Sequence, residues 1–393
     1  MDTEKTLDML RRRETASRPS IFDLSKSGDR ARFETLLKEG AIKQISDDYE
    51  EQQRELFGIK NPSRVYAPGF EEAFQEHYHS LSAGKSLSEH GRWAYFPWRY
   101  LAAHILPEEE YWLVRTARNQ NLITKEEQEK FYNATVGIAG LSVGSSVALA
   151  LVLQGGPKHL KLADMDRLAL SNTNRIVAGA DRLGMLKVEM AARTLYEINP
   201  YAELELYSDG LTPENIDAFC EGLDLIIDEI DNLAVKYLIR KQAQKRKIAV
   251  VMAADNGDNA VVDIERQDID PQPEFFHGRM GRVSYETLSK LDKFGIGKMI
   301  TKLVGPENVT ERMQQSLTQM GKTIVSWPQL GGAALINGAA VAYCVRKILN
   351  GQPLESNRAL VSLDEKLIPD YTTPAAAARR QKISDDFAKG FGL

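Results

Sequence analysis

The sequence predicts an α/β fold with a doubly wound, mostly parallel sheet, preceded by a mainly helical N-terminal domain. From residue 136 onward, short apolar segments alternate with longer amphipathic segments, and Gly or Pro residues often separate them. Before about residue 110, helical patterns dominate instead. Strands that alternate with helices are typical of a parallel sheet with helices on both faces.

The N-terminal part contains two segments of helical pattern, 31–40 and 45–58, each closed by a glycine. An aromatic-rich segment follows at 90–106. Aromatic side chains dominate both cores and interfaces, so we expect this segment to pack between domains. The alternative is a groove for an extended peptide.

The later part reads as a series of strands and helices in strict alternation. Apolar or alternating segments predict strands, and segments of helical period predict the connections between them. We expect strands at 136–140, 159–164, 202–207, 223–228 and 248–254, and helices at 145–156, 184–200, 213–222 and 234–247.

Four regions are expected along the chain. Residues 1–110 form the mainly helical domain, which could bind substrate or peptide, and 111–267 form the main α/β domain. Residues 268–373 combine an irregular lid or substrate region with a small-residue helix that completes the α/β fold, and 374–393 look like an exposed tail.

Composition and charge exclude several classes of protein. At ~150 residues per domain, 393 residues suggest two or three domains. The net charge of −5 argues against a general nucleic-acid binder. The N-terminus lacks an apolar signal region, and the uncharged windows 132–157 and 326–345 contain Gly, Ser, Asn or Gln. We therefore expect a cytoplasmic protein that does not bind membranes.

The two cysteines, Cys220 and Cys344, are far apart. They cannot form a disulfide framework or a four-thiolate zinc site, so no zinc is predicted.

A glycine-rich turn, GLSVGSS at 140–146, joins the first strand of the α/β region to its helix. Glycines let a backbone approach phosphates, and a helix N-terminus offers free N–H groups. Asp164 ends the next strand, where an acidic residue meets ribose hydroxyls in nucleotide sites. Gly140, Gly144 and Asp164 alone would also suit an NAD-dependent oxidoreductase.

The same turn also reads as G-x-S-x-G, the nucleophile elbow of α/β-hydrolases. Ser142, then Asp228 or Asp231, then His277 would give the order of a catalytic triad. A hydrolase usually has several strands before its nucleophile, and here the first clear strand is the one that leads into the turn.

Two further polar segments follow strands. DMDRLALSNTNR at 164–175 crowds acidic, amide and basic groups beyond one strand end, and DEIDN at 228–232 follows another. In a parallel sheet such ends share one edge, where ligands bind. Arg and Lys for phosphates, an Asp for ribose and an Asp for Mg²⁺ make a nucleoside triphosphate site.

These motifs resemble the ubiquitin-activating-type (ThiF/MoeB/MccB-like) adenylyltransferase superfamily, which is Rossmann-like. The resemblance runs from about residue 111 to 263, and more weakly over 324–351. Its pattern is an Arg before the first strand, a Gly-rich turn, D-x-D-x-x-x-x-S-N-x-x-R, a later Lys and D-x-x-D-N. Here these are Arg118, GLSVGSS, DMDRLALSNTNR, Lys187 and DEIDN.

The resemblance implies a role for each matching residue. Gly140 and Gly144 would meet ATP, and Asp164 would bind its ribose. Phosphates would be held by Asn172, Arg175 and Lys187, and Mg²⁺ by Asp231 with Asn232; Asp166 is a further nucleotide-binding candidate. Arg118 would reach the site from the partner in a homodimer.

The implied reaction is attack of a carboxylate on the α-phosphate of ATP, which gives an acyl-adenylate that a second nucleophile then consumes. The carboxylate would belong to a peptide or small protein, and peptide natural-product maturation is one setting. The departures are Ser142 in place of a glycine and the lack of Cys-x-x-Cys pairs, and both cysteines read as buried residues, so no thioester relay is expected. The alternatives are activation of a ubiquitin-like sulfur carrier, an NAD-dependent oxidoreductase and a non-catalytic nucleotide-binding protein.

Overall fold

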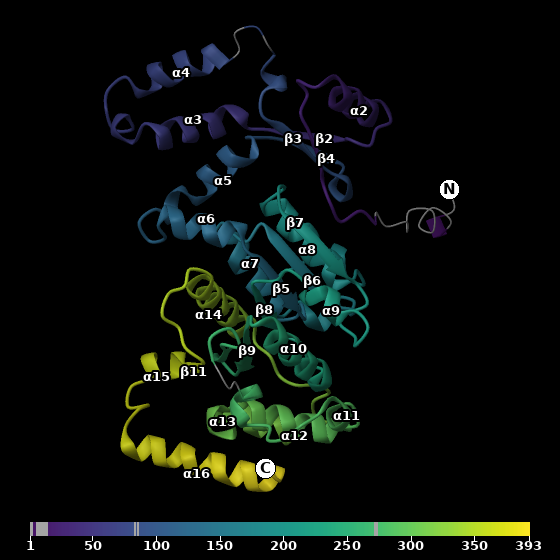
Figure 1. Ribbon diagram of the computed structural model, residues 1–393, viewed down its shortest axis with the longest axis vertical. Helices are drawn as coiled ribbons and strands as arrows, with labels where there is room; N and C mark the ends of the chain where they lie inside the picture. Colours follow the sequence, from purple (N-terminus) through teal and green to yellow (C-terminus); the bar gives the residue numbers. More distant parts are fainter. Residues whose placement is uncertain (1–2, 5–14, 82–83, 85, 271–273) are drawn as a thin grey trace. The chain divides into compact units, whose positions relative to one another are not determined.

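The computed structural model describes residues 3–4, 15–81, 84, 86–270 and 274–393. The chain divides into two compact units (Figure 1). Unit 1 contains residues 1–125 and 193–201, and unit 2 contains 126–192 and 202–393. The functional division predicted at 110, 267 and 373 stays a prediction.

Unit 1 is built on a four-stranded sheet of order β1-β3-β4-β2. Helices accompany it, as predicted, but the sheet itself was not predicted. The aromatic segment supplies its central strands, β3 and β4, and Trp93, Tyr95 and Phe96 are buried in the unit. The strands are β1 (Ser20–Phe22), β2 (Gln44–Asp47), β3 (Arg92–Phe96) and β4 (Leu101–Ile105), and the main helices are α2 (Ser27–Lys38), α3 (Tyr49–Lys60), α4 (Phe70–Leu81) and α5 (Glu108–Thr116).

His104 of β4 is the central polar group of unit 1. Its ring is stacked between Tyr49 and Trp93, with centroids 4.1 and 4.4 Å away. Nδ1 lies 2.9 Å from Asp47 Oδ1, and Nε2 lies 2.7 Å from the carbonyl oxygen of His90. The sandwich ties α3, β2, β3 and β4 together.

Unit 2 contains a seven-stranded sheet of order β11-β10-β9-β8-β5-β6-β7. From β9 to β7 all neighbours are parallel, and β10 and β11 add an antiparallel edge. The predicted doubly wound, mostly parallel sheet is confirmed. Its strands are β5 (Thr135–Ala139), β6 (His159–Ala163), β7 (Glu203–Tyr207), β8 (Leu225–Asp228), β9 (Ala249–Asn256), β10 (Asn259–Glu265) and β11 (Asn357–Val361).

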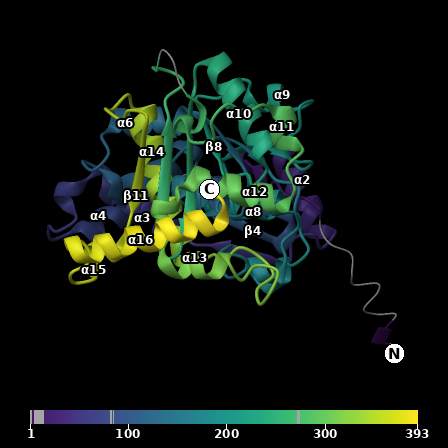
Figure 2. The ribbon, with the colours of Figure 1, turned by 90° about the horizontal axis from the view of Figure 1, so that it is seen from below.

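Helices cover both faces of this sheet, and Figure 2 shows α10 and α14 on opposite sides of its strands. Residues of α9 and α10 share a core with β5, β6, β8 and β9. On the other face, α14 contacts α7, β9 and β10. The helices of unit 2 around this sheet are α7 (Gly144–Leu153), α9 (Ile216–Cys220), α10 (Leu233–Arg246) and α14 (Gly331–Leu349). α6 (Lys125–Asn133) precedes β5, and α8 (Lys187–Ile198) begins in unit 2 and passes into unit 1 at residue 193.

Within the described residues, α14 is the helix long and apolar enough to span a membrane. It is the helix predicted from the second uncharged window. Its small residues allow close packing: a Cβ placed at Gly338 would lie 2.7 Å from the carbonyl oxygen of Ser146 on α7. α14 therefore packs inside unit 2, against the sheet and against α7.

The region after β10 forms a helical layer of unit 2, and α16 lies beside α13 in it (Figure 2). Where the sequence predicts an exposed tail, the structure has helix α16, which buries Ser384 and Phe387. The helices of this layer are α11 (Tyr285–Ser289), α12 (Lys293–Val304), α13 (Glu311–Leu317), α15 (Leu363–Leu367) and α16 (Pro374–Phe391).

Candidate active site

The candidate site lies at the carboxyl edge of the parallel strands in unit 2. The chain order β7-β6-β5-β8-β9 reverses direction between β5 and β8, and such reversals are where open α/β sheets bind ligands. Most of the predicted site residues lie in the segments that follow β5, β6 and β8. This carboxyl edge is the rim of the sheet.

Gly140 begins the glycine turn with φ +88°, a backbone conformation that favours glycine. A Cβ at this position would lie 2.8 Å from the backbone nitrogen of Ile230 and closer still to the carbonyl group of Glu229. Gly144 opens α7, and a Cβ there would lie 3.1 Å from Ile138 Cγ2. Both glycines thus pack the turn against its neighbours, and their contact with ATP stays a prediction.

Asp164 joins the glycine turn to the end of β6. Its Oδ2 accepts a hydrogen bond from the Leu141 N–H at 2.7 Å, and its Oδ1 accepts one from the Asp166 N–H at 2.8 Å. Burial raises the pKa of Asp164, although nearby Lys187 opposes the change. Each carboxylate oxygen retains a lone pair, so a ribose hydroxyl could still donate to it.

Lys187 opens α8 with its side chain only 8% exposed. Its Nζ lies 2.8 Å from Asp166 Oδ2 and 3.9 Å from Asp164 Oδ2. The three predicted residues therefore form one cluster. A buried ammonium held by two carboxylates has a fixed position from which it can contact a phosphate oxygen.

Arg175 is attached to the glycine turn through Ser142. Its Nε donates to Ser142 Oγ at 3.0 Å, and one terminal nitrogen donates to Asn174 Oδ1, also at 3.0 Å. Burial lowers the pKa of Arg175, and the negative charges of Asp255 and Asp231 oppose this. The serine that replaces a family glycine thus orients a cationic side chain at the rim.

Asn172 and Asn232 have structural roles in this conformation. Asn172 Oδ1 accepts from the Ala169 N–H at 3.0 Å, which closes a short turn. Asn232 is the N-cap of α10, and its Oδ1 accepts from the N–H groups of Ala234 and Val235. Their predicted contacts with phosphate and Mg²⁺ stay predictions.

Asp228 and Asp231 differ sharply, although both belong to the DEIDN segment. Asp228 is fully buried, where Lys236 Nζ lies 3.2 Å away and Arg240 forms a second ion pair. Burial alone would raise the pKa of Asp228, but these cations lower it below its usual value. Asp231 is exposed at the rim and available to a ligand.

Glu229 lies between these two residues, beneath the glycine turn. Its Oε1 accepts from the Ala253 N–H at 2.9 Å. Burial of this carboxyl raises its pKa well above the usual value, although part of the residue reaches solvent.

Asp255 at the end of β9 is a rim residue that the sequence analysis missed. It is 8% exposed, its Oδ2 accepts from Gln329 Nε2 at 3.0 Å, and its Oδ1 accepts from Asn337 Nδ2. Burial raises the pKa of Asp255 to about 6, although Gln329 and Arg175 oppose this. Asp255 lies at the carboxyl end of an apolar strand, and Asp164 follows directly after another. An acidic residue at the end of an apolar strand is therefore the sequence signal by which Asp255 could have been predicted.

The serine hydrolase interpretation does not fit these contacts. Ser142 Oγ accepts from Arg175, whereas His277 Nε2 lies 3.0 Å from Asp263 Oδ1. Arg358 also donates to Asp263, at 2.7 Å. The expected nucleophile and base are therefore engaged in separate groups.

Arg118 lies in unit 1, in a short 3₁₀ helix, Ala117–Asn119. Its role as a finger from a partner subunit stays a prediction. Among the described residues, no group of three or more His, Cys, Asp or Glu side chains is arranged to hold a metal ion. Mg²⁺ commonly binds one or two protein carboxylates together with phosphate oxygens, and exposed Asp231 fits such a site.

Both cysteines are buried, and burial raises the pKa of Cys220 to about 12 and that of Cys344 to about 11. Thiolates are the reactive form of cysteine, so these are poor nucleophiles in this conformation.

Residues 115–268 match the ThiF family. This part of the chain is a ThiF-family domain. The match covers β5 to β10 together with the glycine turn, the 164–175 segment, Lys187 and the DEIDN segment. The resemblance inferred from the motifs is confirmed.

Relatives match different shares of the chain. "Uncharacterized protein MT1398" of Mycobacterium tuberculosis is 37% identical over 318 residues, which are 77% of this chain and 44% of that protein. "Adenylyltransferase and sulfurtransferase MOCS3" of Drosophila sechellia is 35% identical over 113 residues, which are 28% of this chain and 25% of that protein. The chain thus spans less than half the length of each of these two relatives.

A solved structure, the crystal structure of selenomethionine PaaA, superimposes with a TM-score of 0.47 at 21% identity. The superposition covers 65% of this chain and 77% of PaaA.

Proposed function

We propose that this chain is an ATP- and Mg²⁺-dependent adenylyltransferase that activates a carboxylate of a peptide or small protein as an acyl-adenylate. The observation that carries the proposal is the pair of fixed cations at the rim. Lys187 is held by Asp166 and by Asp164, a carboxylate that itself accepts from the glycine turn, and Arg175 is held by Ser142 of the same turn, which leads into α7. Two positioned cations and a helix N-terminus suit a polyphosphate.

In this reaction the substrate carboxylate attacks the α-phosphate, and pyrophosphate leaves. Arg175 and Lys187 would offset the negative charge that develops on the phosphate oxygens. Asp164 would orient the ribose through its free lone pairs. Mg²⁺, bound by Asp231 and phosphate oxygens, would supply further charge neutralisation.

The second step is direct attack of a nucleophile on the acyl-adenylate, without a thioester relay. What supports this is the burial of both cysteines and the raised pKa of their thiols. Maturation of a peptide product fits a substrate that is released from the adenylate directly, and a cytoplasmic location fits the supply of ATP.

Binding and exchange experiments test the proposal. ATP should bind with Mg²⁺, and a panel of peptide carboxylates should stimulate exchange of pyrophosphate into ATP. Asp231→Ala should abolish exchange, whereas Asp386→Ala, on the exposed surface of α16, should leave it unchanged. Binding of NAD(H) in place of ATP would overturn the proposal, and ATP binding without exchange for any carboxylate would support a non-catalytic protein.

A mixing experiment tests the homodimer and the role of Arg118. Arg118→Ala and Asp231→Ala should each be inactive when pure. If Arg118 acts in the partner's site, a mixture of the two variants should regain about a quarter of wild-type activity, because half of the dimers are mixed and each has one intact site. A mixture with no activity would show that Arg118 does not act across subunits.

A further inference from the structure

A cavity of about 860 Å³ lies in unit 2, next to the turn that joins β9 to β10. Its walls come from that turn, α13, residues 328–330, α15 and α16. Ligand sites commonly measure roughly 300–1,000 Å³. The cavity is therefore large enough for a substrate, and the residues proposed to bind nucleotide do not line it.

The lining contains a buried acceptor that has no partner. Gln314 of α13 is 5% exposed, and its Nε2 donates to the carbonyl oxygen of Val309 at 2.8 Å. A carbonyl oxygen can only accept, so this bond fixes the orientation of the amide. Among the described residues, Oε1 then has no hydrogen-bond donor, and leaving a buried acceptor in that state is unfavourable. A ligand N–H would supply the donor.

Three acidic groups of the lining are paired within the unit. Glu307 pairs with Arg279 at 2.5 Å, Glu311 with Arg379 at 2.7 Å, and Glu365 with Lys366 at 2.8 Å. The other charged residues of the lining are two acidic and two basic ones, so their formal charges balance: Asp258, Asp364, Arg312 and Arg380.

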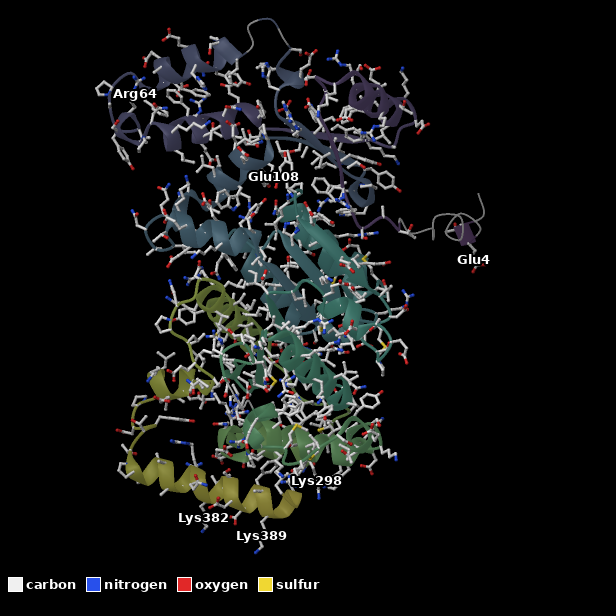
Figure 3. The ribbon with its side chains drawn as sticks, viewed as in Figure 1. Glu4, Arg64, Glu108, Lys298, Lys382 and Lys389 are labelled. Carbon is white, nitrogen blue, oxygen red and sulfur yellow. The ribbon has the colours of Figure 1, made fainter. Side chains whose placement is uncertain are left out.

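The same walls carry apolar side chains, among them Met313, Leu330, Ile368 and Ile383. On α16, Figure 3 shows Lys382 and Lys389 pointing away from the rest of the unit, whereas Arg380 of the same helix lines the cavity. The cavity therefore suits a neutral, apolar group with an N–H donor.

One extended segment separates this cavity from the rim. Pro328 and Leu330 line the cavity, whereas Gln329 between them donates from Nε2 to Asp255 and accepts at its carbonyl oxygen from Asn174 Nδ2 at 2.7 Å. Side chains alternate between opposite sides of an extended chain. The segment is thus a wall with an apolar side toward the cavity and a polar side toward Arg175.

We propose that this cavity binds the apolar peptide segment that precedes the carboxylate to be activated, with a backbone N–H donating to Gln314 Oε1. The carboxylate would then pass residues 328–330 to reach the rim. The proposal rests on the proposed function, because a carboxylate substrate is what the rim would activate. A peptide supplies the two features that the cavity requires, neutral apolar side chains and N–H donors at short intervals.

Binding of two probe peptides to the full chain tests this assignment. N-acetyl-Leu-Leu, with a free carboxylate, should bind saturably when titrated up to 10 mM and followed by calorimetry, and N-acetyl-Glu-Glu should bind at least tenfold more weakly. Ala377→Trp, which fills the cavity from α16, should weaken binding of N-acetyl-Leu-Leu at least tenfold. Ala378→Trp is the control, because Ala378 is the exposed neighbour outside the lining.

A second pair of variants tests the hydrogen bond. Gln314→Leu should weaken N-acetyl-Leu-Leu about fivefold, whereas Gln315→Leu, on the exposed side of α13, should change affinity less than twofold. If the wild-type chain does not bind N-acetyl-Leu-Leu, or if Ala377→Trp and Ala378→Trp behave alike, the assignment is wrong. ATP affinity, measured on the same proteins, distinguishes failure of this assignment from failure of the proposed function. If only the cavity assignment is wrong, the chain still binds ATP.

Discussion

Replacement of Gly140 by alanine tests the claim that this glycine is required by packing of the turn. The new Cβ would collide with the backbone of Glu229 and Ile230, which cannot move as a side chain can. It would also adopt φ +88°, which is unfavourable for an L-residue. The conformational strain costs about 1–2 kcal/mol, and overpacking adds about 1–3 kcal/mol. Gly140→Ala should therefore lower the free energy of unfolding of unit 2 by about 2–5 kcal/mol.

Gly144→Ala is the matched control in the same turn. Its Cβ would meet the Cγ2 methyl group of Ile138 at 3.1 Å, a side-chain and not a backbone contact, and Gly144 has no positive φ. Alanine is also favoured over glycine in a helix by about 1 kcal/mol. The net effect of Gly144→Ala on stability should stay within about 1 kcal/mol.

Urea denaturation with hydrogen exchange of β5 and β8 as the readout measures both variants. Exchange should accelerate in β5 and β8 for Gly140→Ala and remain near wild type for Gly144→Ala. Equal stability of the two variants would refute the reasoning, because it would mean that the backbone of 229–230 yields without cost.

Three more predictions concern the rim and the cysteines. Ser142→Ala should weaken ATP binding about five- to tenfold, because a hydrogen bond to a charged group contributes about 1.5–3 kcal/mol and Arg175 keeps other partners; an ATP titration checks this, and Arg175→Ala should weaken binding more. The pKa of Asp255, raised from 3.8 to about 6, means that the folded state holds its proton more tightly than the unfolded state. Its contribution to the free energy of unfolding should therefore fall as pH rises from about 4 to about 6, by up to about 3 kcal/mol, and Asp255→Asn should flatten that slope in urea titrations at several pH values. Cys220→Ala and Cys344→Ala should each retain adenylate formation and acyl transfer to the second nucleophile. If either variant still exchanges pyrophosphate into ATP but no longer transfers the acyl group, the direct mechanism is contradicted.

The parallel sheet and most of its helices could be predicted from the sequence because each strand there is a short apolar run with a turn signal after it. The polar groups that follow β6 and β8 could also be found, since strand ends in a parallel sheet share an edge. The sheet of unit 1 was missed because Pro97 interrupts its aromatic segment between β3 and β4, and because the segment lacks a clear alternation and so resembles core segments of any kind.

The contacts that individual site residues make could not be predicted from the sequence. Nothing in DEIDN indicates that Asp228 is buried against Arg240 while Asp231 is exposed. Likewise, Gln329 and Asn337 reach Asp255 across more than 70 residues of chain, through a fold that no local pattern encodes.

The packing of α14 bears on how this protein can be divided for experiments. The family match ends at 268, yet Gly331 at the start of α14 lies so close to Asn174 that a Cβ would be 2.5 Å from its carbonyl oxygen. Gly338 covers α7 in the same manner, and Asn337 supports Asp255. A fragment cut at 268 would expose the apolar face of α7 and lose one wall of the proposed nucleotide site. The smallest fragment worth expressing for nucleotide binding therefore extends through residue 349, well beyond the end of the family match.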